Sequence, residues 1–165
     1  MTVIKFCRFI IKQKRNLLEL VRDQRPGLFS RPMAEFFDSS VAGHIRHSND
    51  HFLKLASTGF APGANVDYDN RERDLVAEGD IALAFHNLEV IDDSVKSLGE
   101  SELTRDLTVK FMIDPSGESC SIPSTYSREL AFCSHHATHH LATVRLILET
   151  CGIVVDDGAG LANST

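Results

Sequence analysis

The strongest constraint on the fold is a long stretch of helical periodicity near the C-terminus. Between residues 126 and 150 apolar residues recur at the three- and four-residue spacing of one helix face. At about 100° per residue they gather around one direction, and they are Leu130, Cys133, Ala137, Leu141, Val144 and Leu148. Pro123 with Ser124 or Thr125 is typical of a helix start and Gly152 of a helix end, which predicts a helix to about Thr150.

This predicted helix carries four of the eight histidines of the chain, His135, His136, His139 and His140. On a helical wheel His140 lies roughly 60° from the centre of the apolar stripe and His136 roughly 100°, whereas the other two lie on the far side. Imidazoles at i and i+4 can bind one metal ion from adjacent turns. The phase favours His136 and His140 as an inward metal-binding pair. The alternative is a solvated, histidine-rich face with no metal.

A second histidine-rich segment offers a third ligand. His44, His47 and His51 recur at i, i+3 and i+7, which places them in one stripe about 60° wide if the segment is helical. Ser39 or Ser40 would be its N-cap. Phase places His44 and His51 nearer the apolar side than His47, so periodicity leaves all three as candidates. Two antiparallel helices with facing histidines would form a three-histidine site with one open coordination position.

Composition and charge limit the class of protein. A chain of 165 residues with 42% hydrophobic residues suits one domain over residues 1–165, with no apolar run long enough to span a membrane. The net charge of -6 argues against a nucleic-acid partner, because binding to phosphates relies on a basic surface. The four cysteines form no CxxC pair, which is typical of a reduced, cytoplasmic protein.

The remaining segments complete a four-helix pattern. The basic N-terminal region reads as an amphipathic helix, with an organelle transit segment as the alternative, and another helix is expected from about Arg73 to Leu98. Between Thr104 and Ile122 apolar and polar residues alternate around a turn, which suggests a short hairpin or an ordered crossover. We therefore expect an all-α four-helix bundle with a long connection before the last helix, in which the first and last helices each pack against the two between them.

Four blocks of the sequence occur in an order that is typical of one family. They run from Ser40 to Phe52, from Val66 to Asp74, from Ser124 to His140 and from Gly158 to Thr165. Together they resemble the DinB/YfiT-like family of metalloenzymes. The resemblance implies a four-helix bundle in which one histidine of the second helix and an HxxxH pair of the last helix bind a divalent metal ion. Matched position by position, these ligands are His47, His136 and His140, with His51 and His44 as alternatives to His47.

The resemblance also implies a chemistry. Some family members transfer or isomerise groups with the thiols bacillithiol, mycothiol or glutathione, so it implies a metal-dependent enzyme, a thiol S-transferase or a hydrolase, that holds Zn²⁺ or Ni²⁺. The alternative is a non-catalytic metal-binding stress-response protein. We expect a small-molecule substrate such as a thiol and no nucleic-acid or membrane partner. Whether the protein forms a homodimer stays open. The chain departs from the common pattern at His135, where a smaller residue is usual, and in its basic N-terminal helix.

Other residues could support such a site, and the sequence assigns no catalytic or substrate-binding residue. Glu129 lies one heptad before His136 and could orient a ligand imidazole or act as a general base; the alternative is an ion pair with Arg128 or with an arginine of residues 69–74. Cys133 is a fourth-ligand candidate or a buried apolar residue. Tyr68 and Arg71 could cover the mouth of a metal pocket or belong to a solvated face.

Overall fold

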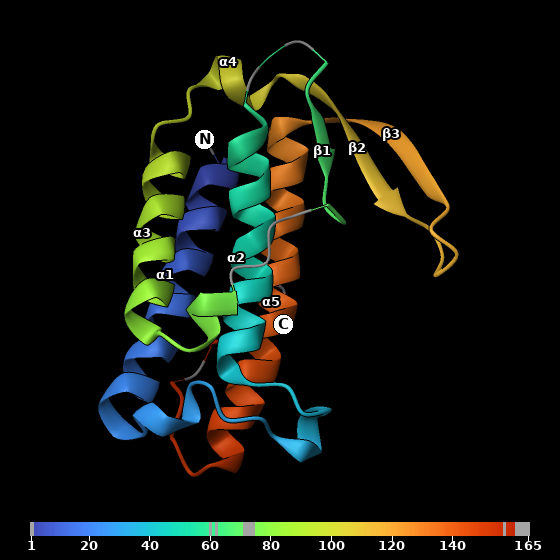
Figure 1. Ribbon diagram of the computed structural model, residues 1–165. Helices are drawn as coiled ribbons and strands as arrows, with labels where there is room; N and C mark the ends of the chain where they lie inside the picture. The colour runs from blue at the N-terminus through green and yellow to red at the C-terminus, as the bar shows by residue number, and fades with distance from the viewer. Residues whose placement is uncertain (1, 60, 62, 71–74, 157, 161–165) are drawn as a thin grey trace.

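The computed structural model describes residues 2–59, 61, 63–70, 75–156 and 158–160 (Figure 1). Its long helices are α1 (Thr2–Gln24), α2 (Val41–Thr58), α3 (Ile81–Lys96) and α5 (Tyr126–Thr150). Short helical segments are η1 (Pro26–Leu28), η2 (Ala34–Phe36), η3 (Leu75–Glu78) and α4 (Glu100–Leu103). Parts of two blocks behind the family resemblance, residues 71–74 with Arg71 and residues 161–165, lie outside the described residues.

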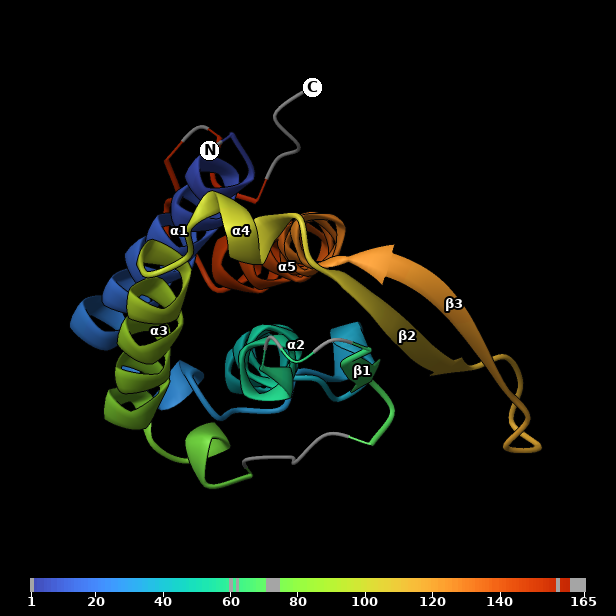
Figure 2. The same cartoon turned by 90° about the horizontal axis from the view of Figure 1, so that it is seen from above.

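A three-stranded mixed sheet accompanies the helices, so the expectation of an all-α fold is wrong. Strand β1 (Asn65–Asp67) pairs in parallel with β2 (Asp106–Met112), with Val66 opposite Val109, and β2 pairs antiparallel with β3 (Ser119–Thr125). The alternation between residues 104 and 122 predicted the β2–β3 hairpin, which extends away from the helices in Figures 1 and 2. Strand β1 was missed because three residues are too short for a recognisable alternation and their partner lies far along the chain.

The four long helices pack in an order that the sequence did not predict. The extensive contacts join α1 to α3 and α5, and join α2 to the same two helices (Figure 2). The expected packing of the first helix on the second, and of the last on the third, is therefore wrong. The reason lies in the long connection from α1 to α2, residues 25–40, which contains η1 and η2 and crosses the end of the helices before α2 begins.

Capping side chains explain where helices α2 and α5 begin, and the apolar residues of α5 form its buried face. The Ser40 hydroxyl accepts a hydrogen bond from the Gly43 amide at 3.0 Å, and the Thr125 hydroxyl accepts one from the Arg128 amide at 3.3 Å. The predicted apolar stripe of α5 is buried at every position, namely Leu130, Cys133, Ala137, Leu141, Val144 and Leu148. In the described part of the chain no helix is both long and apolar enough to cross a membrane.

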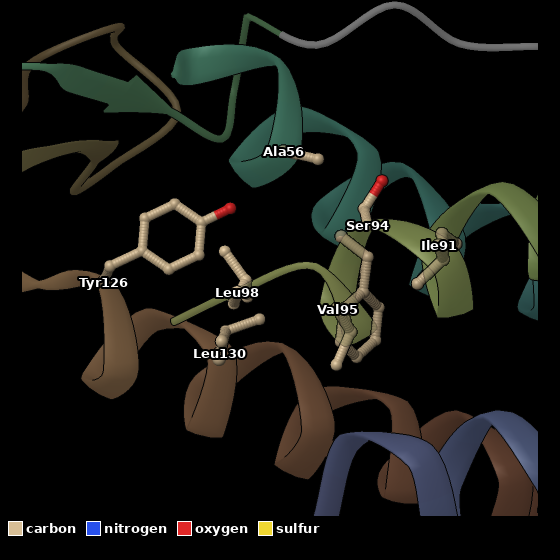
Figure 3. A pocket seen from close by; sticks show the side chains of 8 residues that line it. Ala56, Ile91, Ser94, Val95, Leu98, Tyr126 and Leu130 are labelled. Atoms are coloured by element: carbon tan, nitrogen blue, oxygen red, sulfur yellow. The ribbon is translucent and has the colours of Figure 1, made fainter. Parts of the chain in front are cut away.

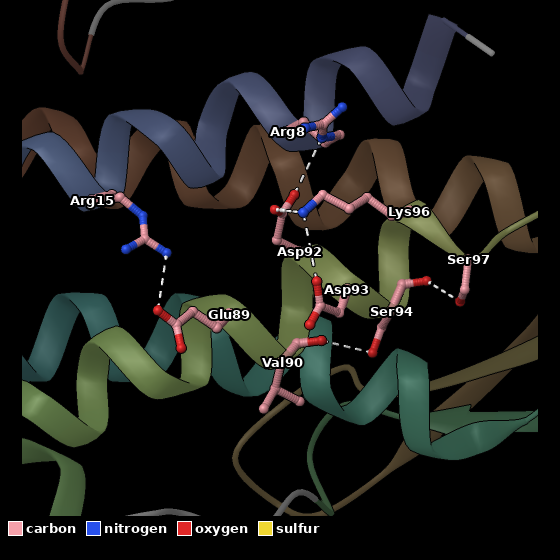
Figure 4. A network of polar contacts seen from close by, with 9 residues as sticks. All are labelled: Arg8, Arg15, Glu89, Val90, Asp92, Asp93, Ser94, Lys96 and Ser97. Atoms are coloured by element: carbon pink, nitrogen blue, oxygen red, sulfur yellow. Dashed lines mark hydrogen bonds and ion pairs between the residues drawn. The ribbon is translucent and has the colours of Figure 1, made fainter.

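Ion pairs join the basic face of α1 to acidic residues of α3 (Figure 4). Arg8 Nε lies 3.3 Å from Asp92 Oδ1, and Arg15 lies 3.8 Å from Glu89. Asp92 also pairs with Lys96 of its own helix at 2.6 Å. The basic N-terminal segment is therefore a helix of the fold, and acidic residues of α3 compensate part of its charge.

Candidate metal centre

Helices α2 and α5 run antiparallel and in contact (Figure 1). Histidines of both helices meet at their junction. One ring nitrogen each of His47, His136 and His140 lie within 4.8 Å of one another. All three side chains are half-buried. The structure thus brings together the inward pair chosen by helical phase and the α2 histidine chosen by the family resemblance.

The spacing of these nitrogens is compatible with a single metal ion. The Nε2 atoms of His136 and His140 are 3.1 Å apart, and the His47 ring centre lies 4.7 Å from that of His140 and 5.0 Å from that of His136. Around a tetrahedral zinc ion with Zn–N distances of about 2.0–2.1 Å, ligand nitrogens lie about 3.3 Å apart. A modest approach of the His47 ring would complete such a set.

The surroundings disfavour the charged form of His140 and His44. Burial and, to a smaller extent, the neighbouring rings of His136, His47, His44 and His139 together lower the pKa of His140 to about 2, because both disfavour a positive charge there. Burial also lowers the pKa of His44. A neutral imidazole keeps the lone pair that a metal ion needs, so protons compete weakly for His140 at neutral pH.

The two other candidate histidines of α2 flank the three-nitrogen group. His44 Nδ1 lies 2.9 Å from His140 Nδ1, and its Nε2 lies 3.0 Å from the Ser39 hydroxyl. His51 is buried, donates from Nδ1 to the His47 carbonyl at 2.9 Å, and has its ring centre 4.3 Å from that of His136. Their inward phase therefore brings each of them against one histidine of α5, on either side of His47.

Glu129 is fully buried and accepts hydrogen bonds from three side chains. Arg128 and Ser124 donate to Oε1 at 2.8 and 2.6 Å, and the Tyr68 hydroxyl donates to Oε2 at 3.0 Å. The expected ion pair with Arg128 is present. A link toward the histidines is present as well, because the Tyr68 ring stacks on His51 at 5.2 Å between centres.

Tyr68 lies inside the protein, so it neither covers the mouth of a pocket nor belongs to a solvated face, the two alternatives that the sequence left open. It is 6% exposed. Burial raises the pKa of its hydroxyl, which therefore stays protonated and donates. The sequence signal that could have found this position is the two-residue strand period from buried Val66, which sends Tyr68 to the same inward face.

The remaining sequence candidates lie outside the three-nitrogen group. Cys133 is fully buried, its sulfur lies 3.6 Å from the Tyr68 hydroxyl, and burial raises its pKa to about 12, so its thiol stays protonated and is a poor ligand at neutral pH. His135 and His139 are exposed, as the helical phase predicted.

Comparison with known proteins gives little further identification. No family model matches the chain, and no solved structure matches it. A curated protein named FK506-binding protein 5, from Rhizopus delemar, is 33% identical over 101 residues, which are 61% of this chain and 26% of that protein. The chain thus spans about a quarter of the length of this relative.

Proposed function

We propose that the chain binds one divalent metal ion, Zn²⁺ or Ni²⁺, through His47, His136 and His140, and that it is a metal-dependent enzyme acting with a low-molecular-weight thiol. The observation that carries the proposal is the convergence of three imidazole nitrogens from two helices within 4.8 Å. Imidazole donors suit both metals. The lowered pKa of His140 adds support, because that ring is neutral at neutral pH and keeps the lone pair that a metal ion binds.

Three protein ligands leave a coordination position for a small molecule, and a metal ion in the site would lower the pKa of a thiol or water there. The residues around the histidines suit an anionic thiol. Phe132 is half-buried, and its ring stacks near His136 with centres 5.8 Å apart. The Arg128 guanidinium lies 5.6 Å from the centre of the Phe132 ring, with 59% of its side chain exposed. Arg128 shares its charge with Glu129, and its exposed N–H groups would donate hydrogen bonds to a carboxylate of such a substrate.

We further propose that the chain is DinB/YfiT-like and cytoplasmic. The order of the four sequence blocks supports the family, although the three-stranded sheet differs from the all-α expectation. The cysteines are all free thiols, which supports a reducing compartment. The alternative function is a non-catalytic metal-binding stress-response protein, which would need the same histidines and no substrate site.

The name of the Rhizopus relative does not carry FK506 binding to this chain. An apolar pocket between α2, α3 and α5 has a volume of only about 10 Å³ (Figure 3). This pocket is far smaller than the roughly 300–1,000 Å³ of sites for drug-sized ligands. The side chains of Tyr126, Leu98 and Leu130 lie around this small space. Open hollows of about 450 and 480 Å³ lie elsewhere on the described surface, beside Lys12 and Arg15 and beside Arg105 and Asp106.

Metal content and thiol transfer test the proposal in sequence. The purified chain should contain about one zinc or nickel ion by element-resolved mass spectrometry, since three ligands from two helices suit one ion. A content of two would require a second site, and none would refute metal binding. Conjugation of an electrophile with bacillithiol, mycothiol or glutathione should then depend on the bound ion. Metal binding without conjugation of any of the three would favour the non-catalytic alternative.

A further inference from the structure

A chain of polar groups leads from the backbone before α2 to His140. The Ser39 hydroxyl donates to the Phe36 carbonyl at 2.6 Å. His44 Nε2 lies 3.0 Å from the same hydroxyl, and His44 Nδ1 lies 2.9 Å from His140 Nδ1. The far nitrogen of His140, Nε2, lies 3.1 Å from Nε2 of His136.

The proton positions along this chain follow one from another. A carbonyl oxygen only accepts, so the single proton of the Ser39 hydroxyl points to Phe36. The hydroxyl oxygen must then accept from His44, which places the proton of a neutral His44 on Nε2. Nδ1 of His44 is left as an acceptor, and His140 must donate to it from its own Nδ1. This arrangement leaves the lone pair of His140 on Nε2, the nitrogen nearest His136.

The turn that presents Ser39 is itself unusual. It closes with a hydrogen bond from the Ser39 amide to the Phe36 carbonyl at 3.1 Å. Both central residues, Phe37 and Asp38, have positive φ angles, 57° and 55°. Asp tolerates this region, but a Phe there is strained, and its side chain is fully exposed and gains no packing. Such strain persists where the surrounding structure imposes it, and here the surroundings include the Ser39–His44 contact.

We propose that His44 is a positioning residue, which binds no metal itself and holds His140 in the ring orientation and tautomer that present Nε2 to the ion. Ser39 and the strained turn hold His44 in the same way. The inference rests on the proposed metal site. This role also explains why His44 faces inward on α2, because His44 contacts the proposed metal ligand His140. The metal ligand that α2 itself contributes is His47. Outer hydrogen bonds of this kind commonly fix the tautomer of ligating histidines.

Zinc affinity, measured by competition with a chromophoric chelator, tests this role. His44→Ala should bind one zinc ion with an affinity lowered by roughly 10- to 100-fold, the usual effect of losing such a partner. His44→Asn should recover most of this loss, because its side-chain oxygen can accept where Nδ1 did. Ser39→Ala should show a smaller loss, and exposed His139→Ala, next to the same ring, is the matched control. Thermal unfolding of each metal-free variant checks that it folds. If His44→Ala does not fold, the His44→Asn and Ser39→Ala variants are enough to test the role of His44.

Three results would overturn the inference and leave the metal site intact. One is an unchanged zinc affinity in both His44 variants. Another is complete loss of the ion in His44→Ala with no recovery in His44→Asn, which would make His44 a ligand. The third is a proton on Nε2 of His140 in the zinc-loaded protein, measured by NMR that distinguishes the two ring nitrogens. If the unaltered chain binds no zinc, the proposed function itself fails.

Discussion

The Tyr68 hydroxyl donates a hydrogen bond to Glu129 Oε2 at 3.0 Å and so joins the residue after β1 to the first turn of α5. The same tyrosine stacks on His51, whose ring lies against His136. Tyr68 therefore connects the segment after β1 to the histidine cluster through His51. A buried carboxylate needs such donors, because an unpaired charge in the interior is costly.

Replacing Tyr68 with phenylalanine should destabilise the fold. The change removes one of three donors from a carboxylate that is fully buried, and such losses cost about 1–3 kcal/mol in the free energy of unfolding. Metal stoichiometry should not change, because the phenyl ring keeps the stacking on His51. Urea denaturation measures the effect, with the exposed Ser121→Ala on β3 as a control. Equal stability of Tyr68→Phe and the unaltered chain would mean that Ser124 and Arg128 satisfy Glu129 by themselves.

Lys14 gives the fold a distinct pH dependence. Its side chain is fully buried on α1, with Nζ 2.8 Å from Asn49 Oδ1, and burial lowers its pKa from 10.5 to about 7. Between pH 7 and 10.5 the unfolded chain keeps a proton on this lysine that the folded chain releases. The destabilising contribution of Lys14 is thus complete below pH 7 and declines as the pH rises.

Lys14→Met should therefore stabilise the protein below pH 7, by on the order of 1–3 kcal/mol after the loss of the bond to Asn49. The gain should shrink as the pH rises toward 8.5. Urea unfolding from pH 6 to 8.5 measures this difference, and exposed Lys12→Met is the matched control. Higher pH is avoided because burial raises the pKa of Cys7 and Cys133, so thiols ionise first in the unfolded chain. A pH-independent difference between Lys14→Met and the unaltered chain would contradict the account.

Phe37→Asn should stabilise the protein by up to about 1 kcal/mol, because asparagine tolerates the left-handed region and the phenyl ring makes no buried contact. Phe37→Ala separates the two causes, since it removes the exposed ring and keeps a residue that disfavours positive φ. A gain in melting temperature in the Asn variant alone indicates relief of backbone strain. Equal gains in both variants would show that only ring exposure matters.

Helical phase predicted directions around each helix well. It selected His136 and His140 as inward and His135 and His139 as outward, and the buried stripe of α5 agrees at every position. Helical phase does not predict how far one helix is displaced along its axis relative to its neighbour. His44 and His51 are separated by a rise of about 10 Å, so the residue that meets the α5 pair depends on how far the antiparallel helices slide past one another. Packing decides that shift, and here it places His47 between the two α5 histidines.

The parts that sequence reasoning missed depend on contacts between distant segments. Asn65–Asp67 becomes a strand through pairing with β2, and Tyr68 then reaches Glu129. The contact of His44 with Ser39 depends on a turn whose positive φ at Phe37 no propensity favours. Such features follow from tertiary packing, which overrides local preference.

Metal content in single alanine variants tests the central claim most directly. The unaltered chain and five variants, His47→Ala, His136→Ala, His140→Ala, His135→Ala and His139→Ala, would be loaded with zinc, dialysed and analysed by element-resolved mass spectrometry. Loss of one imidazole from the three-nitrogen group leaves two donors, which should no longer retain the ion, whereas the exposed His135 and His139 variants should keep about one ion per chain. Full zinc content in the His47, His136 or His140 variant would contradict the proposed metal centre.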